Sequence, residues 1–196
     1  MGRVSKCGGN KMISWKDIWQ KKGEKTTADL VWLDGFENTS INPMDVAEKI
    51  IKILDIKPTD KVLEIGCGAG MLAQHISEKC FYVGLDMTES LLKKHATSLG
   101  HYVIQSEAND IPFKDDYFDK CFSFSVFQYF PDKEYVKSVK QEMFRVTKLT
   151  REISIFIGDL PMKSHDKNHL LFYPSEFKKW EYYEGFYTKE RFNVVV

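Results

Sequence analysis

Short apolar runs alternate along the middle of the chain with stretches in which apolar residues recur every three or four positions. The runs predict strands at 61–65, 81–85, 102–105, 118–125 and 152–157, and the periodic stretches predict helices at 69–79, 88–99 and 131–148. Strands that alternate with helices at this spacing are typical of an α/β fold with a doubly wound parallel sheet. The run 152–157 is nearly all apolar, which predicts a strand buried on both faces.

Helix signals also precede this alternating region. Ser14 and Asp17 form an N-cap signal before an apolar face that carries Trp15 and Trp19, and Asn42 followed by proline starts a second helix. We expect an N-terminal helical lid or extension at 1–42 and the main domain at 43–196. The alternative for the first segment is a helix packed on the edge of the sheet.

The end of the chain is rich in aromatic residues. A short helix is predicted to start at Pro174, and a last strand is predicted at 192–196. Most aromatic residues of 172–192 are expected to form a core between this tail and the sheet. The alternative is that they line a pocket for a cationic or planar substrate.

Composition and charge narrow the class of protein. The chain has 196 residues with 28 basic and 28 acidic side chains, so charge does not indicate a polyanionic partner. The cysteines form neither a CxxC pair nor a metal-binding spacing, which predicts free thiols in a reducing compartment and no metal site. No apolar run is long enough for a membrane span. We therefore expect a cytoplasmic protein, monomeric or homodimeric, that does not bind membranes.

A glycine-rich loop follows the first predicted strand. Glu64 ends the apolar run, and Gly66, Gly68 and Gly70 alternate after it. This pattern predicts a strand, a tight turn and the start of a helix. Open α/β sheets bind nucleotide-like ligands at such a turn. A dinucleotide fingerprint requires glycine at the position of Met71, and the Gly-Lys-Ser/Thr of a phosphate-binding loop is absent. Hydride transfer and phosphoryl transfer are therefore disfavoured relative to methyl transfer.

Two further carboxylates lie where the next two predicted strands end. Asp86 follows the second strand, where an acid accepts hydrogen bonds from ribose hydroxyls, although it could instead cap the helix that begins near Thr88. Asp110 lies in the turn 109–113 after the third strand and could accept from the amine of adenine, with Ile111 beside the ring. The alternative for Asp110 is a plain Asx turn.

At these residues the chain resembles the seven-strand S-adenosylmethionine-dependent methyltransferases. Residues 64–70 are similar to the first motif of that family, Asp86 matches its ribose-binding acid, and 109–113 resemble its segment beside adenine. Residues 118–130 resemble its fourth strand and the loop under the methionine part of the cofactor. The resemblance covers roughly residues 44–160. The chain departs from the family at 147–151, where a Pro-Gly-Gly-type turn is common, in a loop far from the cofactor pocket.

The resemblance implies a Rossmann-like sheet of order 3-2-1-4-5-7-6 with an antiparallel last strand, and S-adenosylmethionine as cofactor. It also implies a set of cofactor-binding residues: Glu64, Gly66, Cys67, Gly68, Gly70, Asp86, Met87, Asp110, Ile111, Ser125, Tyr129 and Trp19. Tyr129 has the alternative of packing in the core. The expected reaction is methyl transfer by in-line displacement to an oxygen or nitrogen of a small molecule.

The methyl acceptor is the least determined part of this interpretation. Asp159, His165 and His169 follow the fifth predicted strand and are candidate general bases, with solvated loop residues as the alternative for the histidines. Residues 125–128 lack the Asn/Asp-Pro-Pro-Tyr/Phe element expected of DNA base methyltransferases, so DNA is not an expected partner. Two alternatives stay open: an enzyme that methylates protein or RNA, and a non-catalytic binding module of the same fold.

Overall fold

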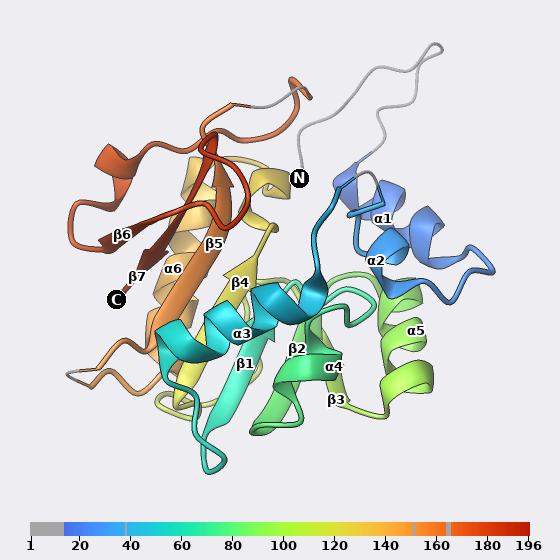
Figure 1. The fold of residues 1–196 in the computed structure, drawn as a ribbon, viewed down its shortest axis with the longest axis horizontal. Helices are drawn as coiled ribbons and strands as arrows, with labels where there is room; N and C mark the ends of the chain where they lie inside the picture. The colour runs from blue at the N-terminus through green and yellow to red at the C-terminus, as the bar shows by residue number, and fades with distance from the viewer. Residues whose placement is uncertain (1–13, 38, 151, 164–165) are drawn as a thin grey trace.

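A single seven-stranded sheet forms the centre of the computed structural model, which describes residues 14–37, 39–150, 152–163 and 166–196 (Figure 1). Its order is β3-β2-β1-β4-β5-β7-β6. The strands are β1 (Lys61–Ile65), β2 (Phe81–Asp86), β3 (Tyr102–Gln105), β4 (Lys120–Phe124), β5 (Ile155–Pro161), β6 (Glu181–Glu184) and β7 (Arg191–Val195). The pairs among β1 to β5 are parallel, and β7 runs antiparallel to both β5 and β6. The predicted strand order and the antiparallel last strand are confirmed.

Helices connect and precede the strands. They are α1 (Trp15–Gly23), α2 (Leu30–Leu33), α3 (Pro43–Leu54), α4 (Ala73–Ile76), α5 (Glu89–Leu99) and α6 (Lys133–Val146), with short 3-10 turns η1 (Phe127–Tyr129) and η2 (Pro174–Phe177). The cap signals read from the sequence are present: Ser14 and Asp17 form a capping box on α1, and the Asn42 side chain accepts from the Met44 amide at the start of α3. The short helix α2 was not predicted.

Two apolar layers cover the two faces of the sheet, because alternate residues of a strand point to opposite faces. On one face Leu63 and Ile65 of β1 pack with α6 and with the aromatic tail. On the other face Val62 of β1 packs with α3 and α4. The tail contributes the fully buried Phe172 and the buried Phe177 and Phe192 to the first layer, so part of it forms the expected core. Tyr173, Tyr182 and Tyr187 are more than 40% exposed.

No strand was predicted at the position of β6, and two other elements differ from their predicted bounds. The helix predicted at 69–79 is reduced to the four residues of α4, because the turn before it extends to Leu72, which has no side-chain cap. The strand predicted at 152–157 lies at Ile155–Pro161 instead, because its last residues continue to pair with β7 across an irregularity between Ile157 and Leu160. The spacing of apolar residues predicts which positions are buried. It does not predict how far a neighbouring strand continues to form hydrogen bonds, which sets where a strand ends.

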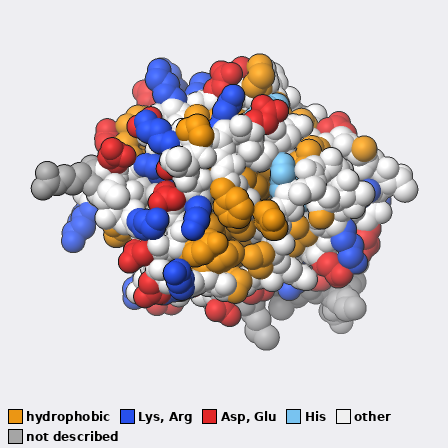
Figure 2. Space-filling view, turned by 90° about the horizontal axis from the view of Figure 1, so that it is seen from below, with side chains coloured by type: hydrophobic (Ala, Val, Ile, Leu, Met, Phe, Trp, Pro, Cys, Tyr) orange, Lys and Arg blue, Asp and Glu red, His pale blue; other side chains and the backbone are white. Residues whose placement is uncertain are grey.

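The face seen from below Figure 1 carries the amino-terminal ends of the parallel strands. Figure 2 shows hydrophobic side chains gathered in the middle of this face with charged side chains around them. Phe81 and Tyr102, which begin β2 and β3, are exposed, and their ring centroids lie 5.6 Å apart. Among the described residues no helix is both long enough and apolar enough to cross a membrane.

Candidate functional site

A cavity of about 390 Å³ lies at the carboxyl ends of β1, β2 and β4. This is the edge where open α/β sheets bind ligands. Its walls come from α1, the turn after α2, the glycine-rich loop, the loop after β3 and the loop after β4. Of the predicted cofactor-binding residues, these line it: Glu64, Gly66, Cys67, Gly68, Asp86, Met87, Ser125, Tyr129 and Trp19. Gly70, Asp110 and Ile111 do not belong to its lining.

The glycine-rich loop turns back against β2 immediately after β1. The amides of Gly66 and Cys67 both donate to the Leu85 carbonyl, at 2.7 and 3.1 Å. Gly66 and Gly68 have φ of +76° and +52°, a region that favours glycine. A Cβ at Gly66 would lie 2.3 Å from Val126, and a Cβ at Gly68 would lie 2.2 Å from a carboxylate oxygen of Asp34. Both glycines are therefore required by close neighbours as well as by backbone conformation.

Asp86 holds the loop from the side of β2. One carboxylate oxygen accepts from the Gly68 amide at 3.1 Å, and the other accepts from the Thr88 amide at 2.8 Å. The second bond closes an Asx turn onto Thr88, which is itself the N-cap of α5, so Asp86 is not the side-chain cap that the sequence left as an alternative. The Asp86 side chain also lines the cavity. Burial raises the pKa of Asp86, and the hydrogen bonds from Thr88 and Gly68 oppose that effect. The ribose role predicted for Asp86 is compatible with this position.

Asp34 holds the same loop from the opposite side, and the sequence did not indicate it. Its Oδ1 accepts from the Ala69 amide at 2.6 Å, and its Oδ2 accepts from the Met71 amide at 2.8 Å. Burial raises the pKa of Asp34 to about 7, because these amide bonds only partly offset the lost solvation and Asp86 adds a like charge nearby. Asp34 also lines the cavity, directly after α2.

Glu64 is buried at the end of β1 and shares a hydrogen bond with β2. The Tyr82 hydroxyl donates to its Oε2 at 2.5 Å. Burial raises the pKa of Glu64 well above its usual range, which the bond from Tyr82 opposes, with added repulsion from Asp34 and Asp86. The ring of Tyr82 packs near His95, whose pKa is lowered to about 4 by burial. Three carboxylates therefore converge on the loop at the base of the cavity.

Aromatic side chains from three segments meet beside the cavity. The Tyr129 ring lies 4.9 Å from Trp15, 5.2 Å from Trp19 and 5.1 Å from His169, measured between centroids. Trp15, Trp19 and Tyr129 line the cavity, so Tyr129 both packs and faces the site. The indole N–H of Trp15 is buried and has no hydrogen-bond partner in the part of the chain that the structure describes. A buried donor of this kind is free to bond a ligand.

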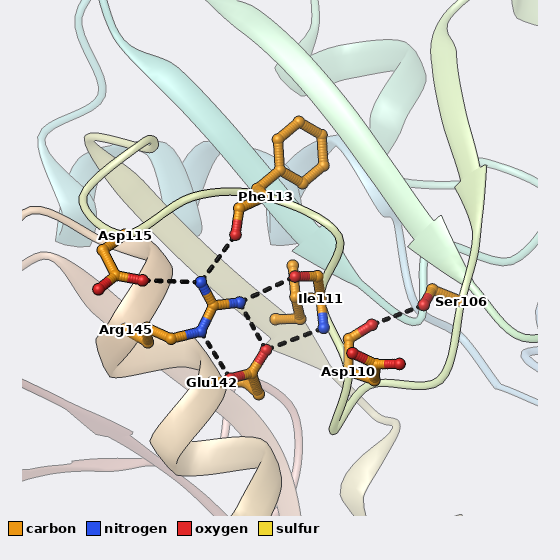
Figure 3. Close-up of polar contacts among 7 residues, drawn as sticks. All are labelled: Ser106, Asp110, Ile111, Phe113, Asp115, Glu142 and Arg145. Atoms are coloured by element: carbon orange, nitrogen blue, oxygen red, sulfur yellow. Dashed lines mark hydrogen bonds and ion pairs between the residues drawn. The ribbon is translucent and has the colours of Figure 1, made fainter.

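The loop after β3 reaches the cavity through Ser106, Glu107 and Ala108, ahead of the predicted Asp110. The Ser106 hydroxyl donates to the Asp110 carbonyl at 2.6 Å, which closes a local turn (Figure 3). Ile111 is buried in the core layer that contains α6, so its side chain does not border the cavity. The adenine contacts of Asp110 and Ile111 stay a prediction, and the residues of this loop that line the cavity are Ser106, Glu107 and Ala108.

Two residues of α6 fix this loop, and sequence reasoning missed both. Arg145 donates to the carbonyls of Ile111 and Phe113 at 2.8 and 2.7 Å, and Glu142 accepts from the Ile111 amide at 2.9 Å (Figure 3). Arg145 also pairs with Glu142 at 2.7 Å. Because these bonds satisfy main-chain groups of an irregular segment, they define where the loop lies beneath the cavity.

The candidate bases lie on the side of β5. Asp159 is buried and does not line the cavity; Arg191 donates to its Oδ2 at 2.7 Å. Asp159 and Ser125 both have positive φ, +62° and +59°, and the Ser125 amide donates to the Gly158 carbonyl at 3.1 Å. His169 contacts the Trp15 and Tyr129 rings, and His165 lies outside the described residues. The structure thus gives Asp159 an ion-pair partner and, of the two candidates that it describes, brings His169 to the aromatic wall.

Comparisons with known proteins identify the domain. Residues 63–150 match the family model described as a methyltransferase domain. Residues 63–150 therefore form a methyltransferase domain, and the seven-stranded sheet has the order that the sequence resemblance implied. The resemblance noted from the sequence is thereby confirmed, and the matched region includes the glycine-rich loop, Asp86 and Asp110.

Individual relatives of this methyltransferase domain are distant. An 18S rRNA (guanine(1575)-N(7))-methyltransferase of Saccharomyces cerevisiae is 31% identical over 88 residues, which are 41% of this chain and 31% of that protein. Phosphoethanolamine N-methyltransferase 1 of Haemonchus contortus has a TM-score of 0.71 at 13% identity, covering 92% of this chain and 47% of that one. A protein of Methanococcus maripaludis described as an S-adenosylmethionine-dependent methyltransferase has a TM-score of 0.66 at 16% identity, covering 98% and 96%. The chain spans less than a third of the curated relatives it matches.

Proposed function

We propose that this chain binds S-adenosylmethionine in the cavity and transfers its methyl group to an oxygen or nitrogen of a small-molecule acceptor. The observation that carries the proposal is the cavity beside α1, which is lined by several carboxylates and by the glycine-rich loop. When bound, the cofactor supplies a methyl group already activated by a sulfonium, so the protein mainly has to align the acceptor. Alignment alone contributes about 7–11 kcal/mol to such a reaction.

The charge of the cavity suits a cationic cofactor. Asp34, Glu64, Asp86 and Glu107 line it, and the lining residues include a single cation, Lys16, which lies 3.8 Å from Glu107. Burial raises the pKa values of Asp34, Glu64 and Asp86, so their ionised forms are poorly solvated without a ligand. A positive sulfonium and ammonium would stabilise those ionised forms. An anionic pyrophosphate would meet repulsion instead.

The residues around the cavity fit the parts of the cofactor. Glycine at positions 66 and 68 lets Val126 and the Asp34 carboxylate lie close against the loop that lines the cavity, since a Cβ at either position would collide with them. Asp86 would accept from ribose hydroxyls, and the segment 106–108 would border adenine. Ser125, Tyr129 and Trp19 would surround the methionine part. The unpartnered N–H of Trp15 adds a donor to the same space.

The covered shape of the site favours a small acceptor. Trp15 and Trp19 of α1 lie over the cavity and contact Tyr129, so a macromolecule would have to displace α1 to reach the methyl group. His169 is the candidate base that lies on this aromatic wall, and Asp159 remains a candidate only if its pair with Arg191 opens. A base is required only for an acceptor that carries a proton at the attacking atom. Residues 1–42 as a lid and a cytoplasmic location remain predictions.

Calorimetry with S-adenosylmethionine and S-adenosylhomocysteine tests the cofactor. We expect saturable binding of both ligands and no binding of NADH. If neither ligand binds at millimolar concentration, the proposal is contradicted.

Incubation of the protein with methyl-labelled S-adenosylmethionine and a cell extract tests the acceptor. We expect label in the fraction that passes a small-pore filter. A second candidate acceptor is RNA, because two of the matching relatives are named for methylation of tRNA and 18S rRNA. Label that stays with macromolecules and is released by ribonuclease would establish that alternative and remove the small-molecule acceptor.

A further inference from the structure

We propose that Asp34 is a positioning residue that joins the N-terminal helices to the glycine-rich loop and thereby holds α1 and α2 over the cofactor cavity. This inference rests on the proposed function, which it extends by naming the residue that closes the site. Neither the family resemblance nor the matched region assigns a role to Asp34, which lies before residue 63.

The first support is the geometry of the two amide bonds. The two oxygens of one carboxylate accept from Ala69 and Met71, two residues apart in the loop, at 2.6 and 2.8 Å. Asp86 accepts from Gly68 on the other side. Both carboxylates therefore use amides that in nucleotide-binding loops commonly hold a phosphate. The chain's own side chains fill this anion site, which leaves the loop selective for a ligand that needs no phosphate contact.

The second support is the way in which the segment containing Asp34 is packed. Leu33 is fully buried against Ala69 and Leu91, so the residue before Asp34 is anchored on the same loop and on α5. The Ser90 hydroxyl donates to the Gln20 carbonyl at 2.7 Å, which fastens α1 to α5. The segment from α1 to Asp34 is thus held at two places. One of these is a hydrogen-bonded carboxylate at the edge of the cavity.

The third support is what this segment carries into the site. Trp15 and Trp19 line the cavity from α1, and the Trp15 indole N–H has no partner among the described residues. The ring of Trp19 also contacts the turn after Asp34, since a Cβ at Gly35 would lie 2.8 Å from it. The hydrogen bonds of Asp34 to the loop therefore set the position of both indole rings. They thereby also set the side of the cavity where these rings contact Tyr129.

A competing arrangement predicts the opposite result. If the Asp34 carboxylate occupies space that the cofactor needs, removing it should tighten binding. If it holds the loop and the helices closed, removing it should weaken binding. The direction of the change in affinity therefore separates a closing residue from an internal competitor.

The experiment compares Asp34→Asn and Asp34→Ala with the wild-type protein. Glu37→Gln is the matched control, because Glu37 lies on the same segment, pairs with Lys22 at 3.0 Å and does not line the cavity. We expect the Asp34 variants to weaken S-adenosylmethionine binding by roughly tenfold or more, the loss typical of a charged hydrogen-bond acceptor. We expect Glu37→Gln to bind within about twofold of the wild type, since such exposed pairs contribute little.

Hydrogen exchange of the ligand-free protein provides a readout that does not depend on the proposed function. In the Asp34 variants the amides of Ala69 and Met71 and of α1 and α2 should exchange faster, while those of α6 should not change. Faster exchange supports the closing role even if the wild type binds no cofactor, which would contradict only the proposed function. Unchanged exchange, or tighter cofactor binding by the Asp34 variants, would overturn the inference.

A double-mutant comparison adds a second check. In Gly68→Ala the new Cβ would meet the Asp34 carboxylate, so this change should displace Asp34 and speed the exchange of α1. Combining it with Asp34→Ala should then add little to the exchange rate of α1, because one contact is lost in both proteins. Additive effects of the two substitutions would contradict the inference.

Discussion

Two carboxylates at the carboxyl edge of the sheet, the buried Asp159 and the partly buried Asp34, have opposite surroundings. Asp159 lies within β5, pairs with Arg191 at 2.7 Å and is not part of the cavity lining. Among the residues that the structure describes, the hydrogen-bond partners of Asp34 are backbone amides at 2.6 and 2.8 Å, and Asp34 lines the cavity. Burial raises the pKa of both groups, and Arg191 opposes that rise at Asp159. Asp159 is paired with a cation of its own chain and so contributes to the fold. Asp34 has no such cation among its described partners and is available to a cationic ligand.

The same difference bears on the catalytic candidates. Asp159 was expected to serve as a base, but its Oδ2 accepts from Arg191 and its backbone amide donates to the Asn193 side chain at 2.9 Å. His169 contacts the rings of Trp15 and Tyr129, and both of these residues line the cavity, whereas Asp159 does not. We therefore rank His169 ahead of Asp159 as a base, a prediction that substitution of each residue would test.

The largest expected effect is on stability, from breaking the Asp159–Arg191 pair. Arg191→Met should lower the free energy of unfolding by about 3–5 kcal/mol, because it leaves a buried carboxylate without its cation. Urea denaturation followed by circular dichroism measures the change. The double variant Arg191→Met with Asp159→Asn should recover a substantial part of the loss. A loss under about 1 kcal/mol in the single variant would show that the pair does not carry the role assigned to it.

The next effect is on cofactor binding, from the other side of the glycine-rich loop. Asp86→Ala should weaken S-adenosylmethionine binding by about 1.5–3 kcal/mol, because it removes a charged acceptor from the cavity. Asp132→Ala is the matched control: Asp132 accepts from the Tyr135 amide as the N-cap of α6 and does not line the cavity. Its loss should cost about 1 kcal/mol of stability and leave binding unchanged. Equal binding by Asp86→Ala and the wild type would show that Asp86 only holds the turn before α5 and the glycine-rich loop.

A smaller effect concerns the dependence of binding on pH. The pKa of Asp34 is about 7 in the folded protein, so the carboxylate gains charge as pH rises through neutrality. Affinity for the cationic cofactor should increase roughly tenfold between pH 6 and pH 8, and this slope should flatten in Asp34→Asn. Asp86 and Glu64 also face this space, and burial raises the pKa values of both. A slope that persists in Asp34→Asn would assign the titration to one of those two groups.

The smallest effect is on the dependence of stability on pH. The raised pKa of Asp34 means that the folded state binds more protons than the unfolded state between about pH 4 and 7, so its contribution to stability declines as pH rises. His95 acts in the opposite direction, since its pKa of about 4 removes stability as pH falls below 6.5. Asp34→Asn should therefore lose stability more steeply than the wild type on acidification from pH 7 to pH 5. Parallel profiles from urea titrations at several pH values would contradict this.

The sheet could be predicted from the sequence because its signals are local. Apolar runs such as 61–65 and the cap signals at Ser14 and Asn42 act within a few residues, and the structure confirms these elements. The glycines after β1 were also informative, because few residue types tolerate the backbone that Gly66 and Gly68 adopt. Where local signals were weak, as at α2 and at the boundaries of β5, the prediction failed or shifted.

The fold class, the strand order through a family resemblance, and the glycine-rich loop with its acidic neighbours could all be predicted from the residues alone. The contacts between distant segments became visible only in the folded protein: Asp34 on this loop, Arg145 and Glu142 on the segment beside it, and Arg191 on Asp159. These pairs join residues 31 to 35 positions apart. Periodicity reports which face of an element is buried, whereas a hydrogen bond between distant segments depends on how the packed layers bring them together. The loop was therefore readable from sequence, but its closure was not.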